Sequence, residues 1–267
     1  MIILKLGGSV ITKKEANEPT TDYNNLNRIS AEIASSSFDK LIIVHGAGSY
    51  GHPFAKEYEI GKPIKDKEDF NSKKRGFSTT QSWVKKLNTI VCDSLRENGV
   101  LAVSIQPSSF ILTRNKRIYS CDLDVIRKYL DMGFVPVIYG DVVVDLNEEI
   151  KVCVLSGDQI ITYFGKNLNT ERVLLGSDVD GIYTKDPKKY EDAELMKIVT
   201  SCEDMTTEGS INVDVTGGMK GKLLELIELA ELGVESEIIN AGKEGLIKKA
   251  LNHQRVIGTI IKKKNEV

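Results

Sequence analysis

The sequence predicts an α/β fold, a three-layer αβα sandwich with a largely parallel central sheet. The first observation is a series of short apolar runs, such as Ile2–Leu6 and Leu41–Val44, with the length and composition of strands buried on both faces. The second is that segments with apolar residues at helical spacing lie between these runs. Strands that alternate with helices favour parallel pairing, with helices covering both faces of the sheet. A chain of 267 residues can form one large domain or two lobes.

In the first half of the chain, Asp22 can cap a helix whose apolar positions are Leu26, Ile29 and Ile33. Residues 61–76 are polar, and their basic run at 73–75 indicates either a solvated face or a basic flap over a phosphate site. A further helix follows and ends at Asn98-Gly99. Leu101–Ile105 is then expected to be a strand.

In the second half, Asp122 opens a helix that Gly133 closes. Val142–Asp145 and Ile150–Leu155 flank a short polar segment, so they predict a β-hairpin. Asp158 is expected to cap another short helix. The remaining elements are a long helix from about Thr216 to Gly233, a short helix at 246–251 and a strand at Thr259–Lys262.

The composition excludes several classes of protein. Charged residues make up 28% of the chain with a net charge of −2, which argues against a general nucleic-acid binder. No apolar run is long enough to span a bilayer, and no signal peptide is recognisable. The four cysteines (Cys92, Cys121, Cys153 and Cys202) lack the spacing of a metal site or a disulfide framework. We therefore expect reduced thiols in a cytoplasmic protein.

Glycine, serine and aspartate recur where the apolar runs end. These loops are Gly7-Gly8-Ser9, Gly46-Ala47-Gly48, Gly140-Asp141, Ser156-Gly157-Asp158, Gly176-Ser177-Asp178 and Asn240-Ala241-Gly242. Open parallel sheets bind ligands beyond the carboxyl ends of their strands. Glycine lets backbone N–H groups approach a ligand closely, and consecutive N–H groups form an anion site. Any one loop could be a tight turn, but the repetition predicts a polar, anion-binding edge.

Lysines accompany these loops. Lys5 lies just inside the first strand and Lys14 just beyond the first loop. Gly217-Gly218 opens a helix with Lys220 and Lys222 in its first turns, which suits a phosphate as well as it suits a capped helix with surface lysines. The chain has no G-x-x-x-x-G-K-S/T motif. Gly46, Gly48 and Gly51 match a dinucleotide fingerprint by letters, but the flanking histidines are a poor context for it.

Several motifs together resemble a known family. Lys5-Leu6-Gly7-Gly8-Ser9, the segment 176–187 and residues 214–219 (Asp-Val-Thr-Gly-Gly-Met) resemble the amino acid kinase superfamily, from the first strand to the last. Within it, residues 45–52 (His-Gly-Ala-Gly-Ser-Tyr-Gly-His), 106–109 (Gln-Pro-Ser-Ser) and 156–158 resemble isopentenyl phosphate kinases of the archaeal type. Members of that family make isopentenyl diphosphate from the monophosphate and ATP, on the alternative mevalonate route of isoprenoid biosynthesis.

The resemblance implies one amino acid kinase-like domain over residues 1–267. Its N-terminal lobe (about 1–165) would carry the phosphate-acceptor site, and its C-terminal lobe (about 166–267) the nucleotide site. ATP and Mg²⁺ would be the cofactors, and a small isoprenoid monophosphate the substrate. The expected partner is a second copy in a homodimer, with no nucleic acid and no membrane.

Carried over by position, the resemblance also implies residue roles. The catalytic residues would be Lys5, Lys14 and His52, with both lysines holding the phosphoryl group in flight. ATP would be bound by Lys5, Gly7, Gly8, Ser9, Ala47, Gly48, Asp178, Tyr183, Lys185, Gly218 and Lys222. The phosphate of the acceptor would be bound by Gly46, Gly51, His52 and Gly157. Ala47 stands where many relatives have a third glycine, and its methyl group leaves the N–H available.

A phosphate acceptor determines what His52 has to do. A phosphate monoester has a second pKa near ~6, so at neutral pH it is largely ionised and needs no base. His52 is then expected to donate a hydrogen bond that orients the acceptor. Without the family pattern, a histidine that satisfies its own loop is the alternative, and this is the role we expect for His45 at the end of its strand.

Two other functions stay open. A kinase for another small phosphate or phosphonate, such as fosfomycin, would share the loop around His52. A non-catalytic nucleotide- or anion-binding member of the fold is the other, although the presence of both Lys5 and Lys14 argues against it. The candidates for an apolar pocket wall are Phe77, Gln81, Trp83, Ile138 and Tyr139, for which core packing is the alternative.

Overall fold

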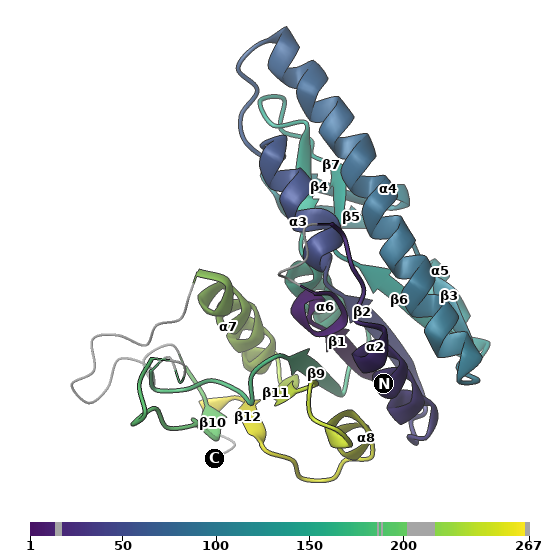
Figure 1. Ribbon diagram of the computed structural model, residues 1–267, viewed down its shortest axis with the longest axis vertical. Coiled ribbons are helices and arrows are strands. Elements are labelled where there is room, and N and C mark those ends of the chain that lie inside the picture. The colour runs from purple at the N-terminus through teal and green to yellow at the C-terminus, as the bar shows by residue number, and fades with distance from the viewer. Residues whose placement is uncertain (14–17, 186, 188, 202–216, 265–267) are drawn as a thin grey trace.

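The computed structural model (Figure 1) describes residues 1–13, 18–185, 187, 189–201 and 217–264. The strands are β1 (Ile2–Leu6), β2 (Leu41–His45), β3 (Ala102–Ser104), β4 (Ile111–Arg114), β5 (Arg117–Cys121), β6 (Val135–Tyr139), β7 (Asp141–Val144), β8 (Val152–Leu155), β9 (Arg172–Ser177), β10 (Ile198–Val199), β11 (Glu235–Asn240) and β12 (Gly258–Ile261). The helices are α1 (Gly8–Ile11), α2 (Tyr23–Ala34), α3 (Gly48–Glu57), α4 (Lys67–Glu97), α5 (Asp124–Asp131), α6 (Gly157–Asn167), α7 (Gly217–Glu231) and α8 (Leu246–Leu251), with a 3₁₀ turn, η1, at Pro107–Ser109.

The central sheet runs in the order β10-β12-β11-β9-β1-β2-β6-β3. All its pairs are parallel except β11 with β12. Since β1 has neighbours on both sides, its residues must be apolar on both faces. Ile3 packs with α5, α6 and α7, whereas Ile2 and Leu4 pack with α2, α4 and α8. The predicted three-layer sandwich with a largely parallel sheet is confirmed.

Two antiparallel hairpins, β4–β5 and β7–β8, stand beyond the main sheet next to α3 and the first part of α4 (Figure 1). The β7–β8 hairpin was predicted and is confirmed. The β4–β5 hairpin was not predicted. Its turn residues Asn115 and Lys116 have φ angles of 53° and 65°, and the carboxylate of Asp145 accepts hydrogen bonds from both of their N–H groups.

The polar segment 61–76 does not form a flap. From Lys67 onward it is the start of the 31-residue helix α4, and Asp66 caps it by accepting a hydrogen bond from the N–H of Asp69. Lys74 and Arg75 are exposed, as a solvated face requires, but Lys73 is fully buried. Its ammonium group lies 2.8 Å from the carboxylate of Asp69, one turn earlier. The prediction of a basic flap over a phosphate site is therefore wrong.

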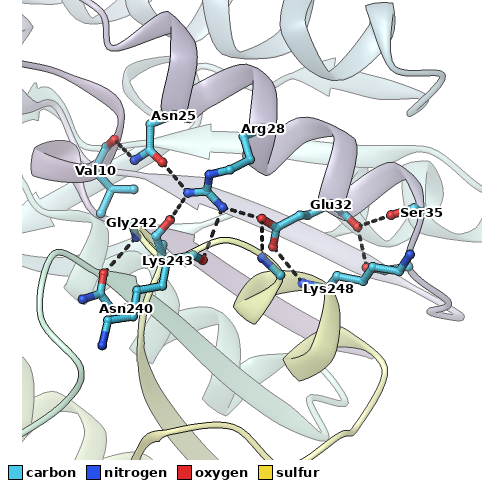
Figure 2. Close-up of polar contacts among 12 residues, drawn as sticks. Val10, Asn25, Arg28, Glu32, Ser35, Asn240, Gly242, Lys243 and Lys248 are labelled. Carbon is cyan, nitrogen blue, oxygen red and sulfur yellow. Dashed lines mark hydrogen bonds and ion pairs between the residues drawn. The ribbon is translucent and has the colours of Figure 1, made fainter.

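A polar cluster joins α2 to the C-terminal part of the chain (Figure 2). The guanidinium of Arg28 donates to Glu32, to Asn25 and to the carbonyl oxygens of Ala241 and Lys243. The carboxylate of Glu32 in turn accepts from the N–H groups of Gly245 (2.9 Å) and Lys248 (3.2 Å), at the start of α8. These contacts fix the segment after β11 against α2.

Candidate active site

A cavity of about 680 Å³ lies at the carboxyl ends of β1, β2, β6 and β9, which is the edge that the loop pattern predicted. Helices α1, α3 and α6 all begin there. The first N–H groups of a helix have no acceptor within it, and the helix dipole adds partial positive charge at that end. Three such helix ends around one cavity create a site for anions.

The first glycine loop (Gly7–Ser9) and the second glycine loop (Gly46–Gly48) contact each other directly. A Cβ atom placed on Gly8 would lie 2.4 Å from the backbone nitrogen of Gly48, and one on Gly46 would lie 2.6 Å from that of Gly8. Gly48 also has a φ of +51°, which favours glycine. The backbones of the two loops therefore pack directly against each other, which brings the starts of α1 and α3 together at the cavity.

Lys5 reaches this cavity from the buried strand β1 and is itself only 5% exposed. Its ammonium group forms an ion pair with the carboxylate of Asp158. A Cβ on Gly157 would lie 3.3 Å from the Cε atom of Lys5, so the lysine passes directly over the start of α6. The carboxylate of Asp158, in the first turn of α6, thus holds the ammonium group of Lys5 in place.

Sequence reasoning missed this role of Asp158. Its expected role as a helix cap is wrong, because Ser156 is the N-cap of α6 and accepts a hydrogen bond from the N–H of Gln159 at 3.2 Å. Serine and aspartate are equally good caps, so the sequence does not choose between them. The distinguishing feature is that Asp158 lies beside Lys5. Because Lys5 is on a strand more than 150 residues earlier, no local sequence pattern shows this contact.

His52 lies on α3 rather than in a loop, since the helix already begins at Gly48. Its side chain is exposed and lines the cavity. Gly51 is buried beneath it, where a Cβ would lie 2.6 Å from that of Ala47 and 2.9 Å from Val84. Gly51 thus lets α3 pack closely against Ala47 and Val84, while His52 lines the cavity.

His45 is fully buried below the second glycine loop. The side-chain amide nitrogen of Asn88 lies 3.4 Å from the carbonyl oxygen of Val137, which can only accept, so this nitrogen is a donor. It therefore also donates to Nε2 of His45, at 3.1 Å, and the proton of the ring sits on Nδ1. Nδ1 donates to the carbonyl oxygen of Gly46 at 3.0 Å. Burial lowers the pKa of His45 to about 4, so the ring is neutral at pH 7 and satisfies its own loop, as expected.

One part of the cavity wall is apolar. Its wall comes from α3, α4, β7 and β8, through Phe54, Ala55, Val84, Val142 and Val154 together with Thr80. None of the residues suggested from sequence lines it: Ile138 and Tyr139 are fully buried in the core, Gln81 bonds to Ser108, and Trp83 stacks on Phe54 with ring centroids 5.7 Å apart. Because Thr80 and Val84 are one helical turn apart on α4, residues 81 and 83 must point elsewhere.

Asp141 is a further lining residue without a predicted role. Its side chain is 2% exposed and accepts hydrogen bonds from the N–H groups of Val142 (2.8 Å) and Ser108 (3.1 Å). Burial raises the pKa of this carboxyl group to about 6. The cavity therefore contains an acid that changes charge just below neutral pH.

The predicted site residues divide into three groups. The cavity brings together Lys5, Gly7, Gly8, Ser9, Gly46, Ala47, Gly48, Gly51, His52 and Gly157. Lys14 lies outside the described residues, as do the surroundings of Gly218 and the side chain of Lys222.

The remaining three predicted residues do not line the cavity. Asp178 follows Ser177, which does line it. The hydroxyl of Tyr183 donates to Asp180 at 3.2 Å, and Lys185 pairs with Asp192. These residues therefore belong to the loop that borders the β9 end of the cavity.

Among the described residues, no three His, Cys, Asp or Glu side chains are grouped as a metal site would require. Nor does any helix in the described ranges have both the length and the hydropathy of a membrane span.

Known proteins resemble this chain over nearly its whole length. The sequence pattern of the amino acid kinase family matches residues 1–240. The isopentenyl phosphate kinase of Methanothermobacter thermautotrophicus is 55% identical over 262 residues, which cover 98% of each chain. That of Methanocaldococcus jannaschii is 37% identical and covers 84% of this chain and 85% of the relative.

Solved structures agree with the sequence comparison. An X-ray structure of isopentenyl phosphate kinase superposes with a TM-score of 0.91 at 52% identity, covering 98% of this chain and 99% of the other. The product complex of the Thermoplasma acidophilum enzyme gives 0.79 at 28% identity, covering 98% and 100%. UMP kinase from Ureaplasma parvum, at 16% identity and a TM-score of 0.63, shares the fold alone. The chain belongs to the amino acid kinase family and, within it, to the isopentenyl phosphate kinases.

Proposed function

We propose that the chain transfers the γ-phosphoryl group of ATP to the phosphate of isopentenyl phosphate and so forms isopentenyl diphosphate. The observation that carries this proposal is the direct contact between two glycine loops, each at a helix start in one cavity that continues into an apolar compartment. Two adjacent anion sites suit a donor and an acceptor phosphate. The apolar compartment suits a short hydrocarbon tail.

The donor phosphates would lie on the first glycine loop, against Gly7, Gly8 and Ser9, with Ala47 and Gly48 on the other side. Glycine at position 8 lets the backbone of Gly48 pack against the first loop, so residues of both loops can line the same part of the cavity. Asp178, Tyr183, Lys185, Gly218 and Lys222 would contact the nucleotide from the C-terminal part. Mg²⁺ usually keeps phosphate and water ligands, so the ATP phosphates would hold it, and when bound it neutralises charge on them.

The acceptor phosphate would lie on the second glycine loop. Gly46, Gly51 and Gly157 surround the place where it would bind, and His52 reaches it from α3. Because a phosphate monoester is already ionised at neutral pH, no residue has to remove a proton from it. His52 would donate a hydrogen bond to one phosphate oxygen and keep another in line with the donor.

Charge and alignment are what the protein contributes to such a transfer, since the transition state of phosphoryl transfer is loose. Lys5 and Lys14 would stabilise the negative charge on the group in flight. Asp158 holds the ammonium group of Lys5 at the start of α6. This ion pair fixes the cation before the substrates arrive, so little reorganisation is needed during the reaction.

The two lobes would bind different substrates. About residues 1–165 supply both glycine loops and the apolar wall, and would form the acceptor site. Gly176, Ser177 and Ile238, from the part after residue 166, also line the cavity, and the nucleotide would bind beside them.

A panel of acceptors tests the proposal. The purified chain is incubated with Mg-ATP and, separately, isopentenyl phosphate, fosfomycin, glutamate and isopentenol, and ADP and the phosphorus spectrum of each product are followed. We expect the highest kcat/KM with isopentenyl phosphate and the signals of a diphosphate. A higher kcat/KM with fosfomycin would shift the assignment to that class of acceptor, and absence of ADP with all four would contradict a kinase.

A further inference from the structure

We propose that the hydroxyl group of Thr12 is a positioning group, which holds the two glycine loops at the separation that phosphoryl transfer requires. The inference rests on the proposed function, in which the first loop holds the donor phosphates and the second loop the acceptor phosphate. Thr12 does not line the cavity, so it acts through the loops and not on a substrate.

One oxygen atom makes the connection. Thr12 directly follows α1 and is 2% exposed. Its Oγ1 donates a hydrogen bond to the carbonyl oxygen of Gly8 at 2.7 Å. The same Oγ1 accepts one from the N–H of Ser49 at 3.1 Å. Thr12 therefore links the first glycine loop to the residue that directly follows the second.

The backbone alone does not make this link. The N–H of Thr12 also donates to the carbonyl oxygen of Gly8, at 3.0 Å, so the residue stays attached to the first loop without its hydroxyl group. Within Thr12, only the hydroxyl reaches Ser49. The start of the second loop has a separate backbone tie, because the N–H of Gly46 donates to the carbonyl oxygen of Leu6 at 2.9 Å. Removing the hydroxyl therefore releases the Gly48 end of the second loop from the first loop and leaves the Gly46 end attached.

Steric contact sets the smallest separation of the two loops, and this hydrogen bond limits the largest. The backbones of Gly8 and Gly48 touch, so the loops cannot move closer together. The bond from Ser49 to Thr12 prevents the Gly48 end of the second loop from moving away, while the N–H of Gly46 holds the other end to Leu6. The hydroxyl also occupies the space beside Gly48, since a Cβ there would lie 2.2 Å from Oγ1 of Thr12. Glycine at position 48 is thus required partly by the linking group itself.

Residues on either side of the segment 14–17 form hydrogen bonds to α3, the helix that carries Ser49. The N–H of Thr20 donates to the hydroxyl of Ser49 at 3.3 Å. The hydroxyl of Thr21 lies 2.9 Å from that of Tyr50. Thr21 offers a matched control, because its hydroxyl bond is also buried and also contacts the start of α3 but touches neither glycine loop.

The separation of the loops matters because transfer needs the acceptor oxygen in line with the γ-phosphorus and close to it. A misplacement of about 1 Å can lower the rate about 100-fold even when both substrates bind. The loss of the hydroxyl should therefore lower kcat. It should leave the affinity for each substrate close to that of the wild type, because the N–H groups that bind each phosphate remain.

Two pairs of variants isolate the hydroxyl. The side chains of threonine and valine have the same shape, and serine differs from alanine by the same group, so we compare wild type with Thr12→Val and Thr12→Ser with Thr12→Ala. Within each pair, kcat per folded enzyme should fall about 10- to 100-fold when the hydroxyl is absent. KM for ATP should change by less than about 3-fold. Acceptor affinity is read from Trp83, the one tryptophan of the chain, which stacks on Phe54 of the cavity wall.

The outcomes distinguish a failure of the proposed function from a failure of the role proposed for Thr12. If the wild type does not convert isopentenyl phosphate, the proposed function fails whatever the variants do. If it does, an unchanged kcat in Thr12→Val and Thr12→Ala overturns the inference alone. So does an equal loss of kcat in Thr21→Val, for which we expect a lower melting temperature and normal kcat. Should Thr12→Val fail to fold, the serine and alanine pair decides the question by itself.

Discussion

At the scale of single residues, neighbouring groups decide which side chain fits at a position and how acidic it is. Gly8 is the clearest case, because its backbone contacts that of Gly48 and leaves no room for a methyl group. Asp141 is a second case, because burial raises the pKa of its carboxyl group against the hydrogen bonds from Val142 and Ser108. Each leads to a measurement on one side chain.

Replacing Gly8 with alanine should impair binding at both loops. The added Cβ would lie 2.4 Å from a backbone nitrogen of the second loop, which cannot move away without shifting the start of α3. We expect KM to rise for both ATP and isopentenyl phosphate and kcat/KM to fall by at least about 10-fold. Steady-state kinetics with each substrate varied in turn measures this. A Gly8→Ala enzyme with normal KM values would mean that the loops are not packed together.

Asp141 makes the stability of the protein depend on pH. Its folded-state pKa of about 6 lies above the ordinary value of 3.8, so its contribution is present below about pH 4 and is lost as the pH rises through 6. Asp141→Asn removes this titration. From pH 4 to pH 7, the stability of the variant relative to the wild type should rise by on the order of 2–3 kcal/mol, measured by urea unfolding. A difference that does not depend on pH would contradict the assignment.

At the scale of elements, the cluster around Arg28 holds the C-terminal segment to α2 (Figure 2). Through Asn25, whose amide donates to the carbonyl oxygen of Val10 at 2.6 Å, the same cluster also reaches α1 behind the first glycine loop. Glu32 is 7% exposed and would remain buried if its cation were removed.

Arg28→Ala should therefore destabilise the fold by on the order of 2–3 kcal/mol, since it leaves a buried carboxylate without its cation and removes the donor to two carbonyl oxygens. Arg96→Ala is the control, because Arg96 pairs with Asp93 at the surface and should contribute less than about 1 kcal/mol. Urea unfolding of both variants measures the difference. Equal effects of the two substitutions would show that the cluster does not hold the segment.

Elements also show how far a sequence determines the structure. The strand ends and their glycine loops were predictable because strand burial and glycine position are local properties. The β4–β5 hairpin was not, because its turn lacks glycine and depends on Asp145, 30 residues away in the sequence. The apolar wall was misassigned for a similar reason. A sequence shows that α4 is amphipathic, but not which of its residues faces a cavity instead of the core.

At the scale of the whole molecule, residues from both ends of the chain meet at one edge of the sheet. Strand β1 lies between β2 and β9, so Lys5 on β1 comes next to loops from about residues 46, 157 and 176. This central position explains how the first residues of the chain can touch both the acceptor and the nucleotide sides. The expected homodimer stays a prediction, which light scattering of the purified protein would check.

The central claim is that the acceptor is an ionised phosphate, oriented by His52 without proton removal. His52→Ala should then lose one hydrogen bond to a charged group, which is worth about 1.5–3 kcal/mol, or roughly one to two orders of magnitude in activity. His52→Gln keeps an N–H donor but cannot act as a base, so it should recover part of that loss.

The most direct test is kcat/KM for isopentenyl phosphate in the wild type, His52→Ala and His52→Gln from about pH 5.5 to 8.5. We predict partial rescue by glutamine, and one shared pH profile that follows the second ionisation of the acceptor near ~6. Glutamine and alanine variants of equally low activity, with a wild-type profile that follows the titration of an imidazole, would contradict the account. The acceptor would then be a group that must lose a proton, such as a hydroxyl.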